Sequence, residues 1–247
     1  MSTQSQGQVL ITGAVGGLGT AMVKRLLGEG HTVIACDRAQ EQAGAWLERL
    51  PPDQQGRVSF HPLDVTKEEQ VNALAETLRS KGIHIAYLVN NAGIHGAGTE
   101  SRVWERTLRV NIHGTFYLTR AFSPAMKAKR FGRIVNLASL SAYHPLNDQG
   151  PYAAAKAAIA GYTRSTALDL ARDGVTVNAI APGLILHDGL KVVFSDAELG
   201  RMGSGIPVGR PGKPEEIAAT VAFLLSPDAA FITGQTIHVN GGSYLPG

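Results

Sequence analysis

Tyr152 and Lys156 are the two residues whose types and spacing point most directly to chemistry. They stand four positions apart in the Ala-rich stretch P-Y-A-A-A-K-A-A-I-A at 151–160, a composition that favours a helix and places both side chains on one face. A free phenol ionises near pH ~10, but a fixed ammonium close by favours the phenolate. The pair is therefore predicted to move a proton to or from a hydroxyl group. Because such a pair also occurs by chance, the surrounding sequence must supply the rest of a site.

A glycine-rich turn near the N-terminus indicates where a nucleotide would bind. An apolar run at 8–12, which predicts a buried strand, leads into T-G-x-x-x-G-x-G and then into a helical stretch at 20–27. A second strand at 31–36 ends before Asp37. Glycines let a backbone approach a pyrophosphate, a helix N-terminus attracts its charge, and an acid after the second strand accepts hydrogen bonds from the adenosine ribose. Glycine turns also arise for steric reasons, so the pattern alone is a hypothesis.

The alternation of strands and helices continues to the C-terminus. Further strands are predicted at about 57–60, 83–89, 132–138, 175–180 and 236–239, and further helices at about 40–50, 67–80 with Thr66 as its cap, 102–129, 151–172 and 214–225. This order predicts a single α/β domain built on a doubly wound parallel sheet of the Rossmann-like kind, with ligands at the carboxyl ends of the strands. Residues 184–210 show no clear period and contain several glycines, so we expect a mobile lid there.

Composition excludes several classes of function. The 247 residues carry a formal net charge of only +3, and the basic residues are scattered among acids, which argues against a nucleic acid or a membrane as the main partner. The one local basic run, at 127–133, is interpreted as a solvated helix end. A single cysteine, Cys36, excludes an internal disulfide, and the eight histidines lack metal-ligand spacing, so no metal is expected. The polar N-terminus has no export signal, which predicts a cytoplasmic protein.

Seven short elements, in order along the chain, carry a resemblance to a known family. They are Thr12-Gly13-x-x-x-Gly17-x-Gly19, Asp64-Val65, Asn90-Asn91-Ala92-Gly93, Asn111, Ser139, Tyr152-x-x-x-Lys156 and Pro182-Gly183. With them the chain resembles the short-chain dehydrogenase/reductase family, in its single-domain subgroup, over essentially its full length. It is similar to 3-oxoacyl reductases and to NAD-dependent secondary alcohol dehydrogenases. The resemblance implies hydride transfer between a nicotinamide cofactor and a secondary alcohol or ketone.

The resemblance also implies a catalytic set of Asn111, Ser139, Tyr152 and Lys156. Ser139 would hydrogen-bond the substrate oxygen, and Tyr152 would exchange the proton with it. Lys156 would favour the tyrosinate and bind the nicotinamide ribose. Asn111 would hold a helix irregularity and a water through which the proton reaches solvent.

The cofactor site that the resemblance implies extends along the strand ends. Its residues are Gly13, Gly17, Leu18, Gly19, Asp37, Arg38, Asp64, Val65, Asn91, Ala92, Gly93, Tyr152, Lys156, Pro182, Gly183 and Ile185. A carboxylate at Asp37 accepts from the 2′-hydroxyl of NAD and repels the 2′-phosphate of NADP, so NAD is expected. Arg38 could pair with that phosphate, which leaves NADP open. His187 stands where the family commonly has a Thr that holds the nicotinamide carboxamide, so the anchor or the lid is expected to differ here.

The substrate is expected to be a small, moderately apolar alcohol or ketone. Substrate contacts are predicted from Ser139, Ser141, His144, Tyr152 and Leu184, and the pocket walls from Ser141, Tyr143, His144, Leu146, Leu184 and 190–194. The segment between Gly93 and Asn111 looks shorter than in many relatives, which would open one side of the site.

Two rival interpretations stay open. The chain could be a 3-oxoacyl reductase that uses NADPH and acts on acyl carrier protein or CoA thioesters, since Arg130 and Arg172 resemble positions that dock the acidic carrier. It could also be a nucleotide-sensing or scaffold protein, because a fold does not fix a function. The family resemblance implies a homotetramer, with a dimer as the alternative, and small residues at Ala153, Ala157 and Ala160 would permit close helix packing.

Overall fold

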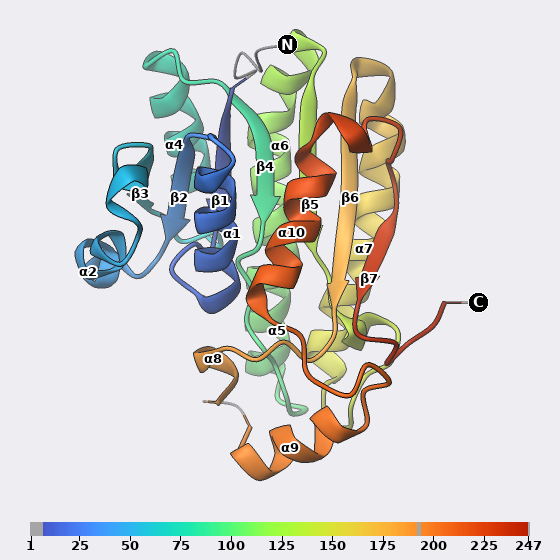
Figure 1. The fold of residues 1–247 in the computed structure, drawn as a ribbon. Helices are drawn as coiled ribbons and strands as arrows, with labels where there is room; N and C mark the ends of the chain where they lie inside the picture. The colour runs from blue at the N-terminus through green and yellow to red at the C-terminus, as the bar shows by residue number, and fades with distance from the viewer. Residues whose placement is uncertain (1–6, 192–193, 247) are drawn as a thin grey trace.

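The computed structural model describes residues 7–191 and 194–246, which form a parallel sheet covered by helices on both faces (Figure 1). The seven strands lie in the order β3-β2-β1-β4-β5-β6-β7. Their bounds are β1 Gln8–Thr12, β2 Val33–Asp37, β3 Val58–Pro62, β4 Ile85–Asn90, β5 Gly132–Leu137, β6 Val175–Pro182 and β7 Thr236–Val239. The α-helices are α1 Gly17–Gly28, α2 Ala43–Glu48, α3 Pro52–Gln55, α4 Glu68–Ser80, α5 Ser101–Leu108, α6 Gly114–Lys129, α7 Gly150–Leu170, α8 Asp188–Lys191, α9 Asp196–Ser204 and α10 Pro214–Leu225.

The two largest hydrophobic cores lie on opposite faces of the sheet. Side chains alternate between the faces of a strand, so Val9 and Ile11 of β1 join one core while Leu10 joins the other. Helices α1 and α10 cover the first core, and α4, α6 and α7 cover the second (Figure 1). Strands β4, β5 and β6 are buried along their whole length, which explains why they appear in the sequence as continuous apolar runs. The predicted doubly wound sheet is confirmed.

The strand order reverses between β1 and β4, and this is where such sheets bind ligands at their carboxyl ends. The two strand ends are tied together by side chains. Asn91 Nδ2 donates to the carbonyls of Thr12 and Gly13 at 2.9 and 3.0 Å, while Thr12 Oγ1 accepts from the amides of Asn91 and Ala92 at 3.1 and 3.0 Å. The glycine turn after β1 and the Asn-Asn-Ala-Gly segment after β4 therefore hold one shape.

The long helix predicted at 102–129 is interrupted where Asn111 lies. A π-helical turn spans Arg109–His113 and joins α5 to α6. Such a turn inserts an extra residue into the helix and is frequent at functional sites.

Two local expectations differ from the structure. Thr66 does not cap α4, because its hydroxyl and amide both donate to the carboxylate of Asp64, and Lys67 holds the cap position instead. A short helix, α3, begins after Pro51, between the predicted helix at 40–50 and the predicted strand at 57–60, since proline suits a first helical turn. The segment 184–210 contains α8 and α9 below the carboxyl ends of the strands (Figure 1).

Candidate active site

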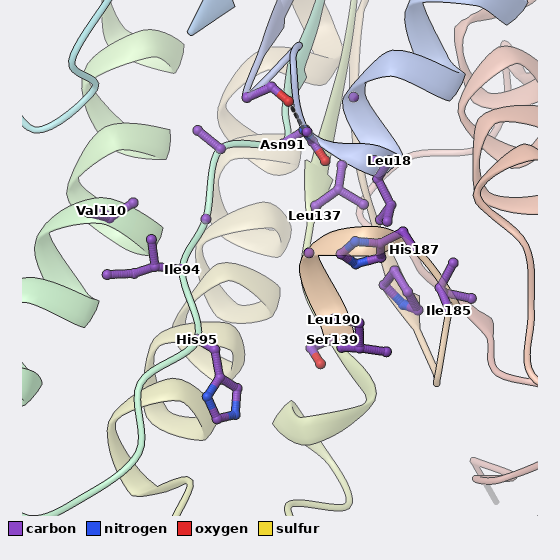
Figure 2. A pocket seen from close by; sticks show the side chains of 18 of the residues that line it. Leu18, Asn91, Ile94, His95, Val110, Leu137, Ser139, Ile185, His187 and Leu190 are labelled. Carbon is purple, nitrogen blue, oxygen red and sulfur yellow. Dashed lines mark hydrogen bonds between the residues drawn. The ribbon is translucent and has the colours of Figure 1, made fainter. Parts of the chain in front are cut away.

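A cavity of about 500 Å³ opens at the carboxyl ends of the strands. All sixteen residues predicted for the cofactor site line it, from Gly13 in the first turn to Ile185 after β6. Ser139 lines it as well. Figure 2 shows Leu18 and Asn91 toward one end of the cavity, and His95, Ser139 and Leu190 toward the other. Segments that are far apart in the sequence therefore meet around one space large enough for a dinucleotide's reactive end and a small substrate.

Lys156 is buried and bound to the end of β5. Its Nζ donates to the carbonyl oxygen of Leu137 at 2.7 Å, and the residue is only 4% exposed. Burial lowers the pKa of the Lys156 ammonium to about 8. The ammonium therefore stays charged at neutral pH, with one hydrogen bond that fixes it and two protons left to donate.

Tyr152 stands one helical turn before Lys156, on α7. Lys156 Nζ lies 5.6 Å from the centroid of the Tyr152 ring. Burial raises the pKa of the Tyr152 phenol, and a hydrogen bond with the Ser139 side chain opposes this only in part. The raised pKa favours the protonated form of the Tyr152 phenol. A protonated phenol is the form that can protonate a carbonyl oxygen.

Ser139 follows the last residues of β5 and begins a 3-10 turn at Leu140–Ala142. Its Oγ accepts a hydrogen bond from the amide of Ser141 at 3.1 Å. A hydroxyl that accepts one bond still has its proton to donate. Ser139 and Tyr152 can therefore both direct an O–H toward one substrate oxygen.

Asn111 lies behind the cavity rather than in its lining. It is fully buried, and its Nδ2 donates to the carbonyls of Ile94 and Thr107, each at 2.9 Å. Its Oδ1 is buried and has no hydrogen-bond partner among the described residues. A Cβ built on Gly93 would come within 2.7 Å of Asn111 Oδ1 and 3.3 Å of Lys156 Nζ. Gly93 therefore keeps open a short path between the Asn111 amide and the Lys156 ammonium.

The glycine turn after β1 fits a pyrophosphate. The N-cap of α1 is Gly16, and no side chain caps the first amides of the helix, so these N–H groups remain available to an anion. A Cβ on Gly19 would overlap the carbonyl oxygen of Gly13, which shows how closely the helix start lies against the strand end. Gly13 has a φ of 64°, a conformation that favours glycine. The residues present fit the diphosphate of a dinucleotide.

Asp37 lies at the end of β2 in the same cavity. Its two carboxylate oxygens accept from the amides of Val15 and Ala39, each at 3.1 Å. These bonds fix the carboxylate beside the glycine turn, where the adenosine ribose of a dinucleotide would lie. Arg38 also lines the cavity.

His187 packs directly on the glycine turn (Figure 2). A Cβ on Gly17 would come within 2.6 Å of His187 Cβ. The His187 Nδ1 is buried without a hydrogen-bond partner in the described part of the chain, and burial lowers the pKa of its ring. His187, which stands where the family commonly has a Thr, therefore brings the segment after β6 against the glycine turn after β1.

The predicted substrate wall is met only in part. Leu184, Leu190 and Phe194 line the cavity, while positions 192–193 lie outside the described residues. Four residues expected in the wall do not line the cavity: Ser141, Tyr143, His144 and Leu146. The ring of Tyr143 instead stacks on Tyr244, with ring centroids 5.5 Å apart, and His144 is exposed.

Two polar residues of the site were not predicted. His95 lines the cavity with its ring centroid 5.2 Å from that of Tyr152, and buried Gln149 contacts the His95 ring. Their positions along the chain offered a signal, because His95 follows the Asn-Asn-Ala-Gly segment by two residues and Gln149 precedes Tyr152 by three.

Two other features are absent from the part of the chain that the structure describes. No group of three or more His, Cys, Asp or Glu side chains there is arranged to hold a metal ion. No helix in the described ranges has the length and apolar character needed to cross a membrane.

One family model and several known proteins match nearly the whole chain. A family model described as enoyl-(acyl carrier protein) reductase matches residues 13–244. The 3-oxoacyl-(acyl-carrier-protein) reductase of Vibrio harveyi is 39% identical over 240 residues, which cover 96% of each chain. The enzyme of the same name from Haemophilus influenzae is 37% identical over 97% of this chain and 99% of its own. That from Aquifex aeolicus is 37% identical over 99% of this chain and all of its own.

Proposed function

The chain belongs to the short-chain dehydrogenase/reductase family, whose members are nicotinamide-dependent oxidoreductases of CH–OH and ketone groups, and we propose that it uses NAD and a secondary alcohol or ketone. One observation carries the proposal. Tyr152, Ser139 and Lys156 line the same cavity as the glycine turn and Asp37. A proton donor, an oxygen-binding hydroxyl and a dinucleotide site thus share one space.

The chain's own residues supply the proton chemistry. When bound, the nicotinamide supplies or receives the hydride at the substrate carbon. In reduction, Tyr152 gives its phenolic proton to the carbonyl oxygen, so that the C=O bond becomes CH–OH. Ser139 donates to the same oxygen and stabilises the charge that develops there. The Lys156 ammonium stabilises the phenolate that Tyr152 leaves behind and has protons free for the nicotinamide ribose.

Asn111 supports the return of the proton to Tyr152. Its free Oδ1 and the open path at Gly93 suit a water that would hydrogen-bond toward Lys156. Such a water would connect the buried ammonium to solvent after each turnover.

The choice of NAD over NADP rests on Asp37. Its carboxylate is fixed by Val15 and Ala39, so it cannot easily swing away from an added 2′-phosphate. Two charges of the same sign a few Å apart repel strongly when they are partly shielded from water. Val15 and Ala14 leave the glycine turn without a cation that would offset this repulsion.

A second candidate is reduction of 3-oxoacyl thioesters, which the names of the relatives favour. Arg130 and Arg172 are exposed and adjacent, with the Arg130 guanidinium donating to the Arg172 carbonyl at 2.9 Å. Arg130 precedes β5, whereas Ser139 comes after it, and six strand residues span roughly 20 Å. In one chain, a carrier docked on these arginines would therefore lie at the far end of the sheet from Tyr152.

We also propose that the chain forms a homotetramer and that 184–210 acts as a lid. Leu168 on α7 is 81% exposed and Phe116 on α6 is 39% exposed, so apolar side chains remain uncovered on both helices, and the small residue Ala157 of α7 is exposed as well. Ala160, expected on the same face, packs inside its own chain instead. The lid is supported by the contact between His187 and Gly17.

A substrate panel tests the proposed function. Purified protein would be assayed with secondary alcohols, simple ketones and 3-oxoacyl thioesters, each with NAD(H) and NADP(H), by monitoring nicotinamide absorbance. We expect turnover with a preference for NAD(H). A clear preference for NADPH would favour the second candidate, and no turnover with any pair would leave a nucleotide-sensing or scaffold role as the better account.

A further inference from the structure

The side-chain amide of Gln149 is held in one orientation. Its Oε1 accepts from the Ser141 hydroxyl at 3.0 Å and from the backbone amide of Leu146 at 3.4 Å. A backbone N–H can only donate, so the atom that faces it must be the amide oxygen. The Nε2 of Gln149 therefore points the other way, toward His95.

This orientation determines the tautomer of His95. Gln149 Nε2 lies 3.0 Å from His95 Nε2, and an amide nitrogen can only donate. His95 Nε2 must then be the acceptor and carry no proton. The ring is neutral with its proton on Nδ1, and burial, which lowers the pKa of His95, acts in the same direction.

The proton on Nδ1 is available to a ligand. His95 lines the cavity next to Tyr152, and its Nδ1 has no hydrogen-bond partner in the described ranges. Nor does this nitrogen belong to the buried polar atoms that lack partners there, so it is not shut off from solvent. Figure 2 places the His95 ring toward the Ser139 end of the cavity, away from Leu18 and the glycine turn. It therefore faces the space for substrate rather than the space for the nucleotide.

We infer that His95 Nδ1 donates a hydrogen bond to a second, uncharged oxygen of the substrate, so that His95 selects ketones that carry a further carbonyl oxygen near the reacting one. The inference rests on the proposed function, since it takes the reacting oxygen to lie on Tyr152. The His95 and Tyr152 rings are neighbours, with centroids 5.2 Å apart. Two donors on adjacent side chains match the two carbonyl oxygens of a 1,3-dicarbonyl unit, which can face the same side.

The surroundings of His95 favour an uncharged oxygen over a carboxylate. Its ring neighbours are Tyr152 and Phe194, whose centroid lies 6.0 Å away, and neither carries a positive charge. A proton on His95 Nε2 would face the Nε2 of Gln149, which also only donates. Gln149 could avoid this only by rotating its side-chain amide, which would break the hydrogen bonds from Ser141 and Leu146 to its oxygen. A carboxylate would therefore have no cation to pair with at this position.

Substrate selectivity tests the inference. The kcat/KM of the acetoacetyl thioester of N-acetylcysteamine would be divided by that of butanone, which has no second oxygen. We expect the wild type to prefer the thioester and His95→Phe, which keeps a ring but removes the donor, to lower this ratio about fivefold. His144→Phe is the matched control, since it makes the same exchange at an exposed histidine that does not line the cavity, and its ratio should stay near that of the wild type.

A spectroscopic measurement tests the positioning role of Gln149 independently of turnover. Nitrogen-15 NMR of the wild type should show His95 protonated on Nδ1, and Gln149→Leu should yield a mixture of tautomers and a lower selectivity ratio. An Nε2-protonated ring in the wild type, or an unchanged ratio in His95→Phe, would overturn the inference. If the wild type reduced butanone but did not prefer the thioester, the inference would fail while the proposed function stood. If it reduced neither, both would fail.

Discussion

The Lys156 ammonium donates a 2.7 Å hydrogen bond to the carbonyl oxygen of Leu137, so the active-site helix α7 is tied to the end of β5. This bond explains how a buried lysine keeps a fixed position beside Tyr152. It also holds the Lys156 ammonium in an environment of low dielectric constant, because only 4% of the residue is exposed.

The first prediction concerns pH. Burial lowers the pKa of Lys156 to about 8, so the ammonium is roughly nine-tenths charged at pH ~7 and roughly one-tenth charged at pH ~9. The charged form is the one that donates to ribose hydroxyls, so NADH affinity should be full below the pKa and fall as pH rises through it. Fluorescence titration of NADH across this range would measure the change. Lys156→Met should bind NADH weakly with no step near pH ~8, and an equal step in this variant would contradict the assignment.

The second prediction concerns Asp37. Replacing it with Ala removes the acceptor for the ribose hydroxyl and the charge that repels a 2′-phosphate, so the ratio of NAD to NADP affinity should fall at least about tenfold. Asp37→Asn is the comparison variant that removes the charge, keeps one acceptor oxygen for the Val15 amide and loses the acceptor for the Ala39 amide. Dissociation constants for both cofactors, measured by calorimetry, would check this. An unchanged preference for NAD in both variants would rule out this role for Asp37.

The third prediction compares two glycines, one without room for an added methyl group and one with room for it. A Cβ on Gly19 would overlap backbone atoms of Gly13 and Ala14, which cannot move cheaply, so Gly19→Ala should cost about 3 kcal/mol of stability. Gly44 lies inside α2 with no heavy atom within 4 Å of the added methyl, so Gly44→Ala should stabilise the protein by about 0.5–1 kcal/mol. Thermal denaturation would show opposite shifts in Tm. Two shifts of the same sign would contradict the packing described for α1.

The fourth prediction concerns assembly. Leu168 is 81% exposed on α7, and covering it in a tetramer would remove its apolar surface from water. Light scattering should give the wild type a mass of four chains and Leu168→Glu a smaller one. Ala73→Glu, on the exposed side of α4, should leave the mass unchanged. A monomeric wild type would rule out the proposed tetramer.

Features that backbone geometry dictates were the ones best predicted from the sequence. Apolar runs predicted the strands, and motifs that come directly after strand ends, such as Gly13 and Asn91, necessarily gather at one edge of a parallel sheet. The sixteen residues predicted for the cofactor site accordingly line one cavity. One local signal was present but not used: Ser195 and Glu198 form a capping box at the start of α9.

Side-chain partners across long separations could not be predicted in the same way. Gln149 and His95 are 54 positions apart, and only the packed structure brings them together. Tyr143 turns toward Tyr244 at the other end of the chain instead of toward substrate. The pKa of Tyr152 depends on burial, which no spacing between Tyr152 and Lys156 reports.

The role of Tyr152 is the central claim, and Tyr152→Phe tests it most directly. The variant keeps the ring and removes only the hydroxyl, so NADH should still bind within about threefold of the wild type. Its kcat for any ketone that the wild type reduces should fall by about 10²–10⁴, the range expected for loss of a general acid. Turnover equal to that of the wild type would contradict the account.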